Sequence, residues 1–387
     1  MNSENFCPVC NFFNVESFFT RKNVPANQNF LIPEKNSALK VVTGNLELQI
    51  CNNCSFIYNQ QFHLDKVEYG NSYENSQDES PLFEEHLSKL AKNLIIEKNI
   101  KNSTIVEVGC GKGSFLKKLI NFDDRKNIGV GFDPSFTGDG LENKNLKFVK
   151  FFYDSDSADI KADVVVCRHV IEHIPNPVDF LKTVRTALSS SKNPRIFFET
   201  PDVDWILKNH VLWDFFYEHC SYFNPKSIRT AFELAGFKIE SIEHVFNNQY
   251  MLIQASLSDD IISTFGTTNE TIKLAKDFSI QEQKHYNFWK NKIDTLFLNG
   301  KIAIWGAGAK GVTFLNLFDL NSKLIDCVVD INPKKQGMFI PGTGHKIIPP
   351  HEIEAKNITN IIIMNPNYFE EIQSNLKQLN LKINLII

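Results

Sequence analysis

TIVEVGCGKGSF, at residues 104–115, is the segment from which the architecture of this chain follows. It reads as an apolar strand with an acidic residue near its end, then a glycine-spaced turn, then the start of a helix. Gly109, Gly111 and Gly113 let the backbone turn sharply and let a ligand approach where a side chain would collide. A turn of this kind, between a strand and a helix, is the ligand site of doubly wound α/β sheets. The segment therefore predicts an α/β fold with a ligand bound over this turn.

The next strand supports a ligand rather than a bare turn. Residues 128–132 form a second apolar segment, and Asp133 follows directly. An acidic residue at the end of the second strand suits the two ribose hydroxyls of a nucleoside. The glycine spacing departs from the dinucleotide pattern G-x-G-x-x-G, whose third glycine comes later. A tight turn that binds nothing is the alternative interpretation.

The surrounding pattern predicts one α/β domain over residues 82–258, followed by a helical stretch at 259–298. A helix is expected over residues 82–99, where leucine and isoleucine recur at helical spacing. Near-continuous apolar runs at 164–166 and 196–198 suit parallel strands that are buried on both faces. The predicted strands cover residues 104–108, 129–132, 146–151, 163–167 and 195–199, with an antiparallel hairpin at 238–245 and 249–256.

Four of the eight cysteines occur as two C-x-x-C pairs, Cys7 with Cys10 and Cys51 with Cys54. In a reducing compartment, two such pairs predict a tetrahedral zinc site with four thiolate ligands. Four sulfur ligands leave no open coordination position, so we interpret the Zn²⁺ as structural and residues 1–64 as a zinc-binding domain. A redox or disulfide role for the pairs is the alternative.

A second glycine-rich turn occurs in KIAIWGAGAKG at residues 301–311. It follows an apolar strand and has the spacing G-x-G-x-x-G, and a later strand at 324–329 ends at Asp330. Further strands at 360–364 and 382–387 predict a Rossmann-like half domain over residues 299–387. The motif is typical of NAD binding, but a full dinucleotide site normally takes two such halves. We therefore favour a turn used for packing or for part of a substrate.

Two histidines follow the fourth predicted strand, in CRHVIEHIPNP at residues 167–177. His169 and His173 would share a face if this segment were a helical turn. Metal binding by the pair lacks a third ligand, and His173 is equally typical of a framework residue.

The segment after the fifth predicted strand, WDFFYEHCSYF at residues 213–223, places Tyr217, Glu218, His219 and Tyr222 together. Imidazole accepts a proton near neutral pH, and a neighbouring carboxylate can raise its basicity. The phenols can donate hydrogen bonds to a developing enolate oxygen. The alternative is a loop of half-buried aromatic side chains that forms the wall of the site.

These elements together resemble the three-domain sugar C-methyltransferases of deoxysugar biosynthesis. The resemblance rests on the paired C-x-x-C motifs, EVGCGKG at 107–113, FFYEHCSYF at 215–223 and WGAGAKG at 305–311, and it covers almost the whole chain. It implies a class I methyltransferase core, a small N-terminal zinc-binding domain and a C-terminal Rossmann-like half domain. It also implies methylation by S-adenosylmethionine at C3 of a nucleotide-linked 4-keto-6-deoxyhexose, through an enolate.

The resemblance assigns roles to individual residues. His219 is the expected base, with Glu218 beside it and with Tyr217 and Tyr222 in the same block. Tyr73 and His173 match positions that face the sugar. The residues expected to hold S-adenosylmethionine are Glu107, Gly109, Gly111, Gly113, Asp133 and His169. The residues expected to help close the C-terminal domain over the nucleotide sugar are Gly306, Gly308, Lys310 and Gly311.

Three other functions compete with this interpretation. An O- or N-methyltransferase would keep the fold and would need no carbon acid. A bifunctional protein would bind NAD(H) at its C-terminal domain and reduce a ketone. A binding module without catalysis is the third, although the ionisable groups around the predicted crevice argue against it.

Composition limits the partners and the location. The formal net charge of −4 does not favour nucleic acid as a partner. No apolar run reaches the length of about 18 residues that a membrane-spanning helix needs. The polar N-terminus resembles no signal peptide, so we expect a cytoplasmic protein, for which a monomer is possible.

Overall fold

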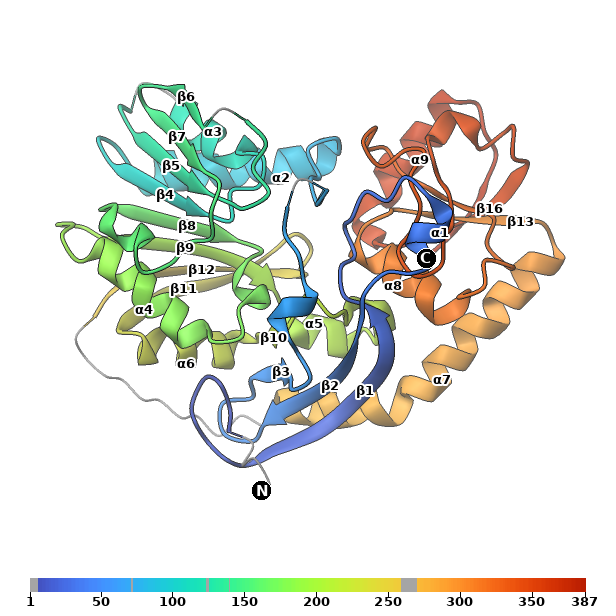
Figure 1. Ribbon diagram of the computed structural model, residues 1–387, viewed down its shortest axis with the longest axis horizontal. Helices are drawn as coiled ribbons and strands as arrows, with labels where there is room; N and C mark the ends of the chain where they lie inside the picture. The colour runs from blue at the N-terminus through green and yellow to red at the C-terminus, as the bar shows by residue number, and fades with distance from the viewer. Residues whose placement is uncertain (1–5, 71, 123–124, 139, 259–269) are drawn as a thin grey trace.

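The computed structural model describes residues 6–387, with gaps at residues 71, 123–124, 139 and 259–269 (Figure 1). Within these residues the strands lie in three sheets, of four, eight and five strands. The eight-stranded sheet is central in the chain, and the four-stranded and five-stranded sheets come mainly from the N-terminal and C-terminal segments.

The central sheet has the order β11-β12-β9-β8-β4-β5-β7-β6. Strands β4, β5, β7, β8 and β9 are parallel, and β12 and β11 add an antiparallel hairpin at one edge. The strands are β4 (Thr104–Val108), β5 (Ile128–Phe132), β6 (Leu141–Asn143), β7 (Leu146–Val149), β8 (Val164–Arg168), β9 (Arg195–Pro201), β11 (Phe237–Val245) and β12 (Tyr250–Leu257). The predicted class I methyltransferase core, with its parallel strands and closing hairpin, is therefore confirmed.

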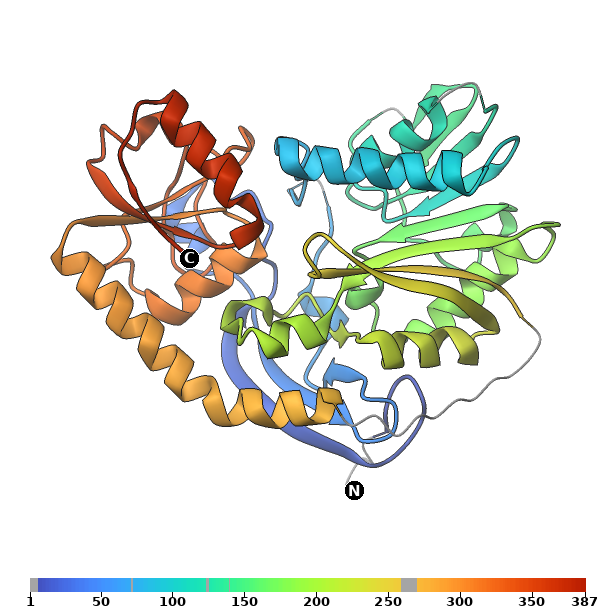
Figure 2. The same cartoon turned by 180° about the vertical axis from the view of Figure 1, so that it is seen from behind.

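Helices cover both faces of this sheet because alternate strand residues are apolar on both sides. On one face Ile105 and Val166 pack against α2 (Pro81–Lys92) and α3 (Ser114–Asn121), which Figure 2 shows from behind. On the other face Val106 and Phe198 pack against α4 (Pro177–Leu188) and α6 (Pro225–Leu234). Helix α2 is shorter than the predicted helix and continues as a π-turn, Asn93–Glu97.

The N-terminal sheet contains β1 (Val15–Pro25), β2 (Thr43–Cys51) and β3 (Ile57–Asn59). Its fourth strand is β10 (Ser221–Tyr222), which pairs antiparallel with β3 and comes from the segment after β9. The short helix α1 (Lys35–Ala38) lies between β1 and β2. The N-terminal sheet is thus joined to the segment that carries Glu218 and His219.

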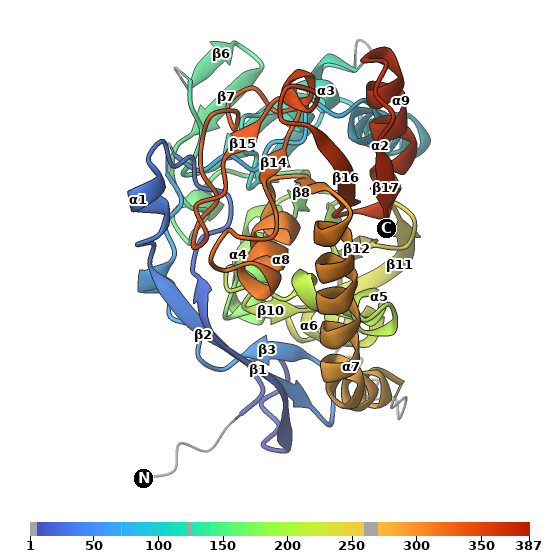
Figure 3. The ribbon, with the colours of Figure 1, turned by 90° about the vertical axis from the view of Figure 1, so that its right-hand side faces the viewer.

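Helix α7 (Glu270–Leu298) leads from the N-terminal sheet toward the C-terminal sheet (Figure 3). The first part of the predicted helical stretch, residues 259–269, lies outside the described residues. The C-terminal sheet has the order β15-β14-β13-β16-β17 and is parallel. Its elements are β13 (Lys301–Trp305), α8 (Ala309–Phe318), β14 (Cys327–Val329), β15 (Ile347–Ile348), β16 (Ile358–Ile363), α9 (Phe369–Gln378) and β17 (Asn384–Ile386).

The prediction of a strand from residue 324 is wrong at its start. The buried Asp319 carboxylate accepts hydrogen bonds from the backbone N–H groups of residues 323–325, at 2.8–3.0 Å. These groups are therefore held in a loop, and β14 begins only at Cys327. Strand β15 was not predicted, because it is only two residues long.

None of the helices in the described ranges is both long enough and apolar enough to cross a membrane.

Candidate active site

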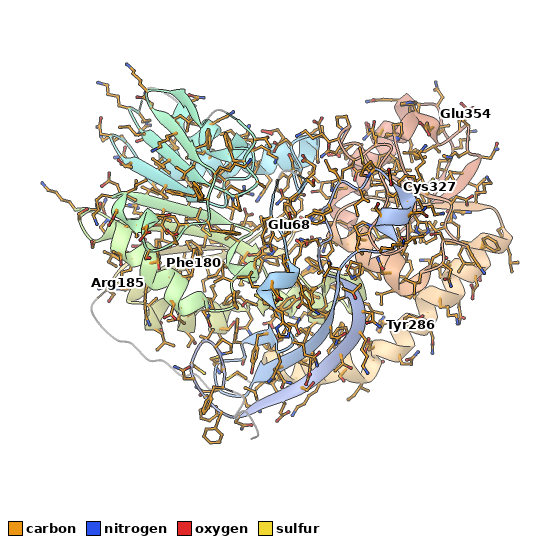
Figure 4. The ribbon with its side chains drawn as sticks, in the orientation of Figure 1. Glu68, Phe180, Arg185, Tyr286, Cys327 and Glu354 are labelled. Atoms are coloured by element: carbon orange, nitrogen blue, oxygen red, sulfur yellow. The ribbon has the colours of Figure 1, made fainter. Side chains whose placement is uncertain are left out.

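A cavity of about 690 Å³ lies between the central and the C-terminal sheets. Its lining comes from the loops after β4, β5, β8 and β9, from the start of α8, and from the connector segment at residues 67–80. The connector runs between the two sheets, where Glu68 is labelled in Figure 4. The predicted site residues that line the cavity are Tyr73, Glu107, Gly109, Gly111, Asp133, His169, His173, Glu218, His219, Gly306, Gly308, Lys310 and Gly311.

The first glycine turn leaves room on its cavity side. Gly109, Gly111 and Gly113 all have positive φ, at 71°, 55° and 81°. A Cβ at Gly109 would overlap the Val170 side chain, whereas a Cβ at Gly111 would meet nothing within 4 Å. Open space beside Gly111 is what a ligand over this turn requires.

Two carboxylates flank the turn. Asp133 accepts hydrogen bonds from Gly111 N at 2.9 Å and from Ser135 N at 2.7 Å, so it holds the turn in shape while it lines the cavity. Glu107 is 2% exposed, and its Oε2 has no hydrogen-bond partner among the described residues. Burial raises the pKa of Glu107 to about 8, and the Arg168 charge opposes this shift. An unpaired buried acceptor beside an open turn fits a ligand that carries hydrogen-bond donors or positive charge.

His169 and His173 do not share a helical face, so that expectation is wrong. His169 has a left-handed backbone, with φ of 53°, and precedes the short 3₁₀ helix Ile171–His173. Its Nδ1 lies 3.4 Å from Glu172 Oε1, and its Nε2 lies 3.8 Å from Glu199 Oε2. His173 instead faces residues from the connector and from the segment after β9.

Glu218 is a buried carboxylate that is held from several sides. It is 1% exposed, and its Oε1 accepts hydrogen bonds from Gln28 N at 2.6 Å and from Asn27 Nδ2 at 3.3 Å. Its Oε2 accepts a hydrogen bond from the Tyr73 hydroxyl at 2.7 Å. These donors fix the side chain, so Glu218 is suited to orient its neighbours.

The two imidazoles of the site lie next to each other. The rings of His173 and His219 are 4.7 Å apart and nearly perpendicular. His173 Nδ1 lies 2.9 Å from the Tyr69 hydroxyl and 2.9 Å from the backbone oxygen of Glu218. Burial lowers the pKa of His219 well below its usual value, and His173 lowers it further. His219 is therefore neutral at physiological pH and can accept a proton.

Tyr217 and Tyr222 do not line the cavity. The Tyr217 hydroxyl donates to Gln61 O at 3.2 Å and accepts from His63 N at 2.8 Å. The Tyr222 hydroxyl donates to Phe216 O at 3.1 Å and accepts from Phe216 N at 3.2 Å. Both phenol hydroxyls form hydrogen bonds with backbone groups, so neither has a part in the proposed reaction.

Sequence reasoning missed Tyr69, Asn27 and Gln28. Tyr69 lies in the same connector as Tyr73, four positions earlier, which is the only signal that pointed to it. Asn27 and Gln28 contact Glu218 from a segment that is distant in sequence, and nothing in their local pattern marks them.

The second glycine turn repeats the arrangement of the first. Asp330 accepts hydrogen bonds from Ala307 N at 2.7 Å and from Asn332 N at 2.8 Å, as Asp133 does at its own turn. Lys335 is 6% exposed and donates to Ala307 O at 3.2 Å, and no carboxylate of the described residues pairs with it. Helix α8 starts directly after Gly308, so its N-terminus and a buried lysine charge both favour an anion here.

The four predicted metal ligands come together away from the cavity. The sulfurs of Cys7 and Cys54 are 3.6 Å apart, as are those of Cys10 and Cys51, and all four lie within 4.8 Å of one another. A tetrahedral zinc site with bonds of about 2.3 Å has sulfurs about 3.8 Å apart. All four cysteines are free, so the cluster fits Zn²⁺.

Comparison with known proteins agrees with this architecture. Residues 81–242 match the methyltransferase domain family, and residues 263–384 match the family described as C-methyltransferase C-terminal domain. The C-methyltransferase NovU of Streptomyces niveus is 23% identical over 355 residues, which cover 86% of this chain and 83% of that protein.

Other similarities cover less of the chain. A tRNA U34 carboxymethyltransferase of Campylobacter fetus is 27% identical over 166 residues, which cover 39% of this chain and 57% of that protein. This chain therefore spans little more than half of that relative. The solved magnesium protoporphyrin IX methyltransferase from Synechocystis, with bound S-adenosylhomocysteine, is 16% identical. Its TM-score is 0.36, and the match covers 46% of this chain and 84% of that chain.

The sheet order and the glycine turn define the class I methyltransferase fold, and residues 81–242 match a methyltransferase domain family. Residues 263–384 add a C-terminal domain that is similar to the one described for C-methyltransferases.

Proposed function

We propose that this methyltransferase acts on a carbon atom, C3 of a nucleotide-linked 4-keto-6-deoxy sugar, through an enolate. The observation that carries the proposal is the composition of the cavity. One cavity contains a glycine turn and acidic residue of the methyltransferase type, a neutral histidine, and a second glycine turn with a buried lysine. A carbon next to a ketone needs a base, whereas oxygen and nitrogen acceptors already carry lone pairs.

The proposed cofactor site uses residues at the carboxyl ends of β4, β5 and β8. Glu107, Asp133 and His169 and the glycine turn at 109–113 would hold S-adenosylmethionine, which supplies an electrophilic methyl group when bound. The open space at Gly111 and the unpaired Oε2 of Glu107 support this assignment.

In the proposed reaction, His219 removes the C3 proton as a general base. Its depressed pKa keeps it unprotonated before the reaction. The Glu218 carboxylate accepts hydrogen bonds from Tyr73, Asn27 and Gln28, which fix its orientation next to His219 in the chain. His173 lies beside His219 and completes the polar lining at which the ketone would bind.

The C-terminal turn would receive the nucleotide part of the substrate. Lys335 and the N-terminus of α8 provide positive charge for a diphosphate, and Asp330 has the position of a ribose-binding acid. This use of the second turn needs no NAD. We also propose that Zn²⁺ bound by Cys7, Cys10, Cys51 and Cys54 is structural.

The test uses S-adenosylmethionine with a ¹³C-labelled methyl group and a freshly prepared nucleotide-linked 4-keto-6-deoxyhexose. We expect the labelled methyl to appear on a quaternary or tertiary sugar carbon in the NMR spectrum. A label on oxygen or nitrogen would replace the proposal with O- or N-methylation. Binding of NADH in place of the nucleotide sugar would favour the bifunctional alternative.

A further inference from the structure

We propose that Asn27 is a positioning residue of the active site, which ties the connector carrying Tyr69 and Tyr73 to Glu218. The inference rests on the proposed function only in taking His173, Glu218 and His219 as the reacting cluster. It assigns the N-terminal segment a direct part in setting the geometry of that cluster.

The Asn27 side chain joins the connector to Glu218. Its Nδ2 donates to Glu68 O at 3.0 Å, and its Oδ1 accepts from Glu68 N at 3.1 Å, so both ends of the amide hold one connector residue. The same Nδ2 lies 3.3 Å from Glu218 Oε1. Asn27 is 8% exposed and does not line the cavity, so it acts through these neighbours.

Hydrogen bonds from the N-terminal segment hold the connector on both sides of Tyr69 and Tyr73. Beyond Asn27, the backbone of the N-terminal segment pairs with the connector, with Leu31 N donating to Ser72 O at 2.9 Å and Glu74 N donating to Asn29 O at 2.8 Å. Asn27 supplies the matching contacts at Glu68. Tyr69 follows Glu68 directly, so the contacts of Asn27 determine where its hydroxyl meets His173.

Loss of the Asn27 contacts would affect His173 and His219 through short contacts made by Tyr69. The Tyr69 hydroxyl is 2.9 Å from His173 Nδ1, and the Tyr69 and Tyr73 rings are 5.1 Å apart. Without the hydrogen bonds at Glu68, the connector would shift and Tyr69 would move away from His173. The His173 ring, which faces His219, would then be less firmly held. The Asn27 amide supplies both a donor and an acceptor to Glu68, which an apolar residue of similar size cannot do.

The experiment compares Asn27→Ala with Tyr69→Phe, which removes the hydroxyl from His173 directly. The readout is the ring nitrogen NMR signal of His173, assigned with His173→Asn, in the full-length zinc-loaded protein without substrate. We expect Asn27→Ala to reproduce the shift caused by Tyr69→Phe although Tyr69 is still present. In the methyl-transfer assay we expect kcat to fall about 100-fold, as for a small misplacement of catalytic groups, with S-adenosylmethionine affinity kept.

Asn59→Ala is the matched control. Asn59 is also buried in the N-terminal sheet, and its side chain forms hydrogen bonds with Glu47, Asn45 and Gln61 but with neither the connector nor Glu218. It should lower thermal stability without changing the His173 signal. If Asn27→Ala does not fold, Asn27→Ser keeps a polar side chain that is too short to reach both Glu68 and Glu218, and it should give the same signal change.

The result that overturns the inference is an unchanged His173 signal in a folded Asn27 variant, whatever its stability. This outcome is separate from a failure of the proposed function. If the wild-type protein does not methylate the keto sugar but Asn27→Ala still changes the His173 signal, the positioning role holds and the substrate assignment fails.

Discussion

At the scale of single residues, the neutral imidazole of His219 is the group on which the proposed chemistry depends. Replacement by asparagine removes the base but keeps a polar side chain of moderate size. We expect His219→Asn to lower methyl transfer by about 10²- to 10⁴-fold, the usual contribution of a general base. Affinity for S-adenosylmethionine, measured by calorimetry, should stay within a factor of a few. Substantial remaining activity would point to an oxygen or nitrogen acceptor.

The pH dependence follows from the direction of the His219 shift. A base must be unprotonated, so the rate rises with pH as the imidazole loses its proton. Because the pKa of His219 is lowered, this rise should lie below pH 6.5, the ordinary value for histidine, and the rate should be flat near pH 7. A profile of kcat/KM against pH checks this, because it reports groups of the free enzyme, and an acid limb centred above pH 7 would contradict it.

Glu107 gives a second pH-dependent prediction. With a pKa of about 8 it is largely protonated at pH 7, and a positively charged ligand favours its ionised form. Affinity for S-adenosylmethionine should therefore rise between pH 7 and pH 9, with proton release on binding. Calorimetry in buffers of different ionisation enthalpy measures this release. Glu107→Gln should abolish the proton release, and if it does not, the group that titrates is another one.

The sequence predicted those residues whose chemistry is visible locally and missed those that depend on distant partners. The glycine turn, Asp133 and the four cysteines stand in recognisable patterns. In the structure Gly109, Gly111 and Asp133 line the cavity, and the four cysteines form one cluster. Asn27 and Tyr69 act through Glu218 and His173, which lie far away along the chain. The Tyr217 and Tyr222 hydroxyls were expected at the cavity, but they donate hydrogen bonds to backbone carbonyl groups and do not line it.

At the scale of elements, the zinc-type cluster fastens the end of β2 to the loop before β1. Cys51 is the last residue of β2, and its sulfur lies 3.6 Å from that of Cys10. We expect metal analysis to find one zinc per chain, and Cys51→Ser to lower both zinc content and the melting temperature. Cofactor affinity should be kept, because the cysteines do not line the cavity.

Cys327→Ser is the control for this prediction, since Cys327 is buried in β14 and belongs to no metal cluster of the described residues. It should leave the zinc content unchanged. Two zinc ions per chain would contradict the account, because the second would occupy Glu172, His173 and His219, the other group close enough to hold a metal. His219 would then not be free to act as a base.

Strand positions in the central sheet were predictable because buried parallel strands are continuously apolar. Two-residue strands were not, since β10 and β15 have no pattern of their own and form only where a partner strand is in place. The late start of β14 also depends on the Asp319 side chain, which accepts a hydrogen bond from a backbone N–H group six residues later in the chain.

At the scale of the whole molecule, one cavity shared by two sheets explains why the two glycine turns occur in one chain. The sequence predicted both turns but could not show that they face each other, because that depends on packing between the sheets. The reciprocal amide pair of Gln249 and Asn365, with both contacts at 2.9–3.0 Å, joins the central sheet to the C-terminal segment beside the cavity.

Substitution of Lys335 tests whether the second glycine turn binds a diphosphate in the shared cavity. Lys335→Ala removes a buried charge that has no carboxylate partner in the described chain, so we expect uridine or thymidine diphosphate to bind at least about 10-fold more weakly. S-adenosylmethionine binding should not change. Lys334→Ala is the matched control, since Lys334 is half exposed and already paired with Glu74. Equal effects of both variants would argue against a diphosphate at the second turn.

The measurement that tests the central claim most directly is hydrogen exchange at the sugar carbon. A nucleotide-linked 4-keto-6-deoxyhexose is incubated in deuterated water with the wild-type protein or with His219→Asn, without a methyl donor, and followed by NMR. The account predicts enzyme-dependent deuterium at C3 with the wild-type protein and its loss in the variant. Exchange that is equally fast in His219→Asn would show that another group is the base. No exchange with the wild-type protein, while S-adenosylmethionine binds normally, would contradict carbon-acid chemistry on this substrate.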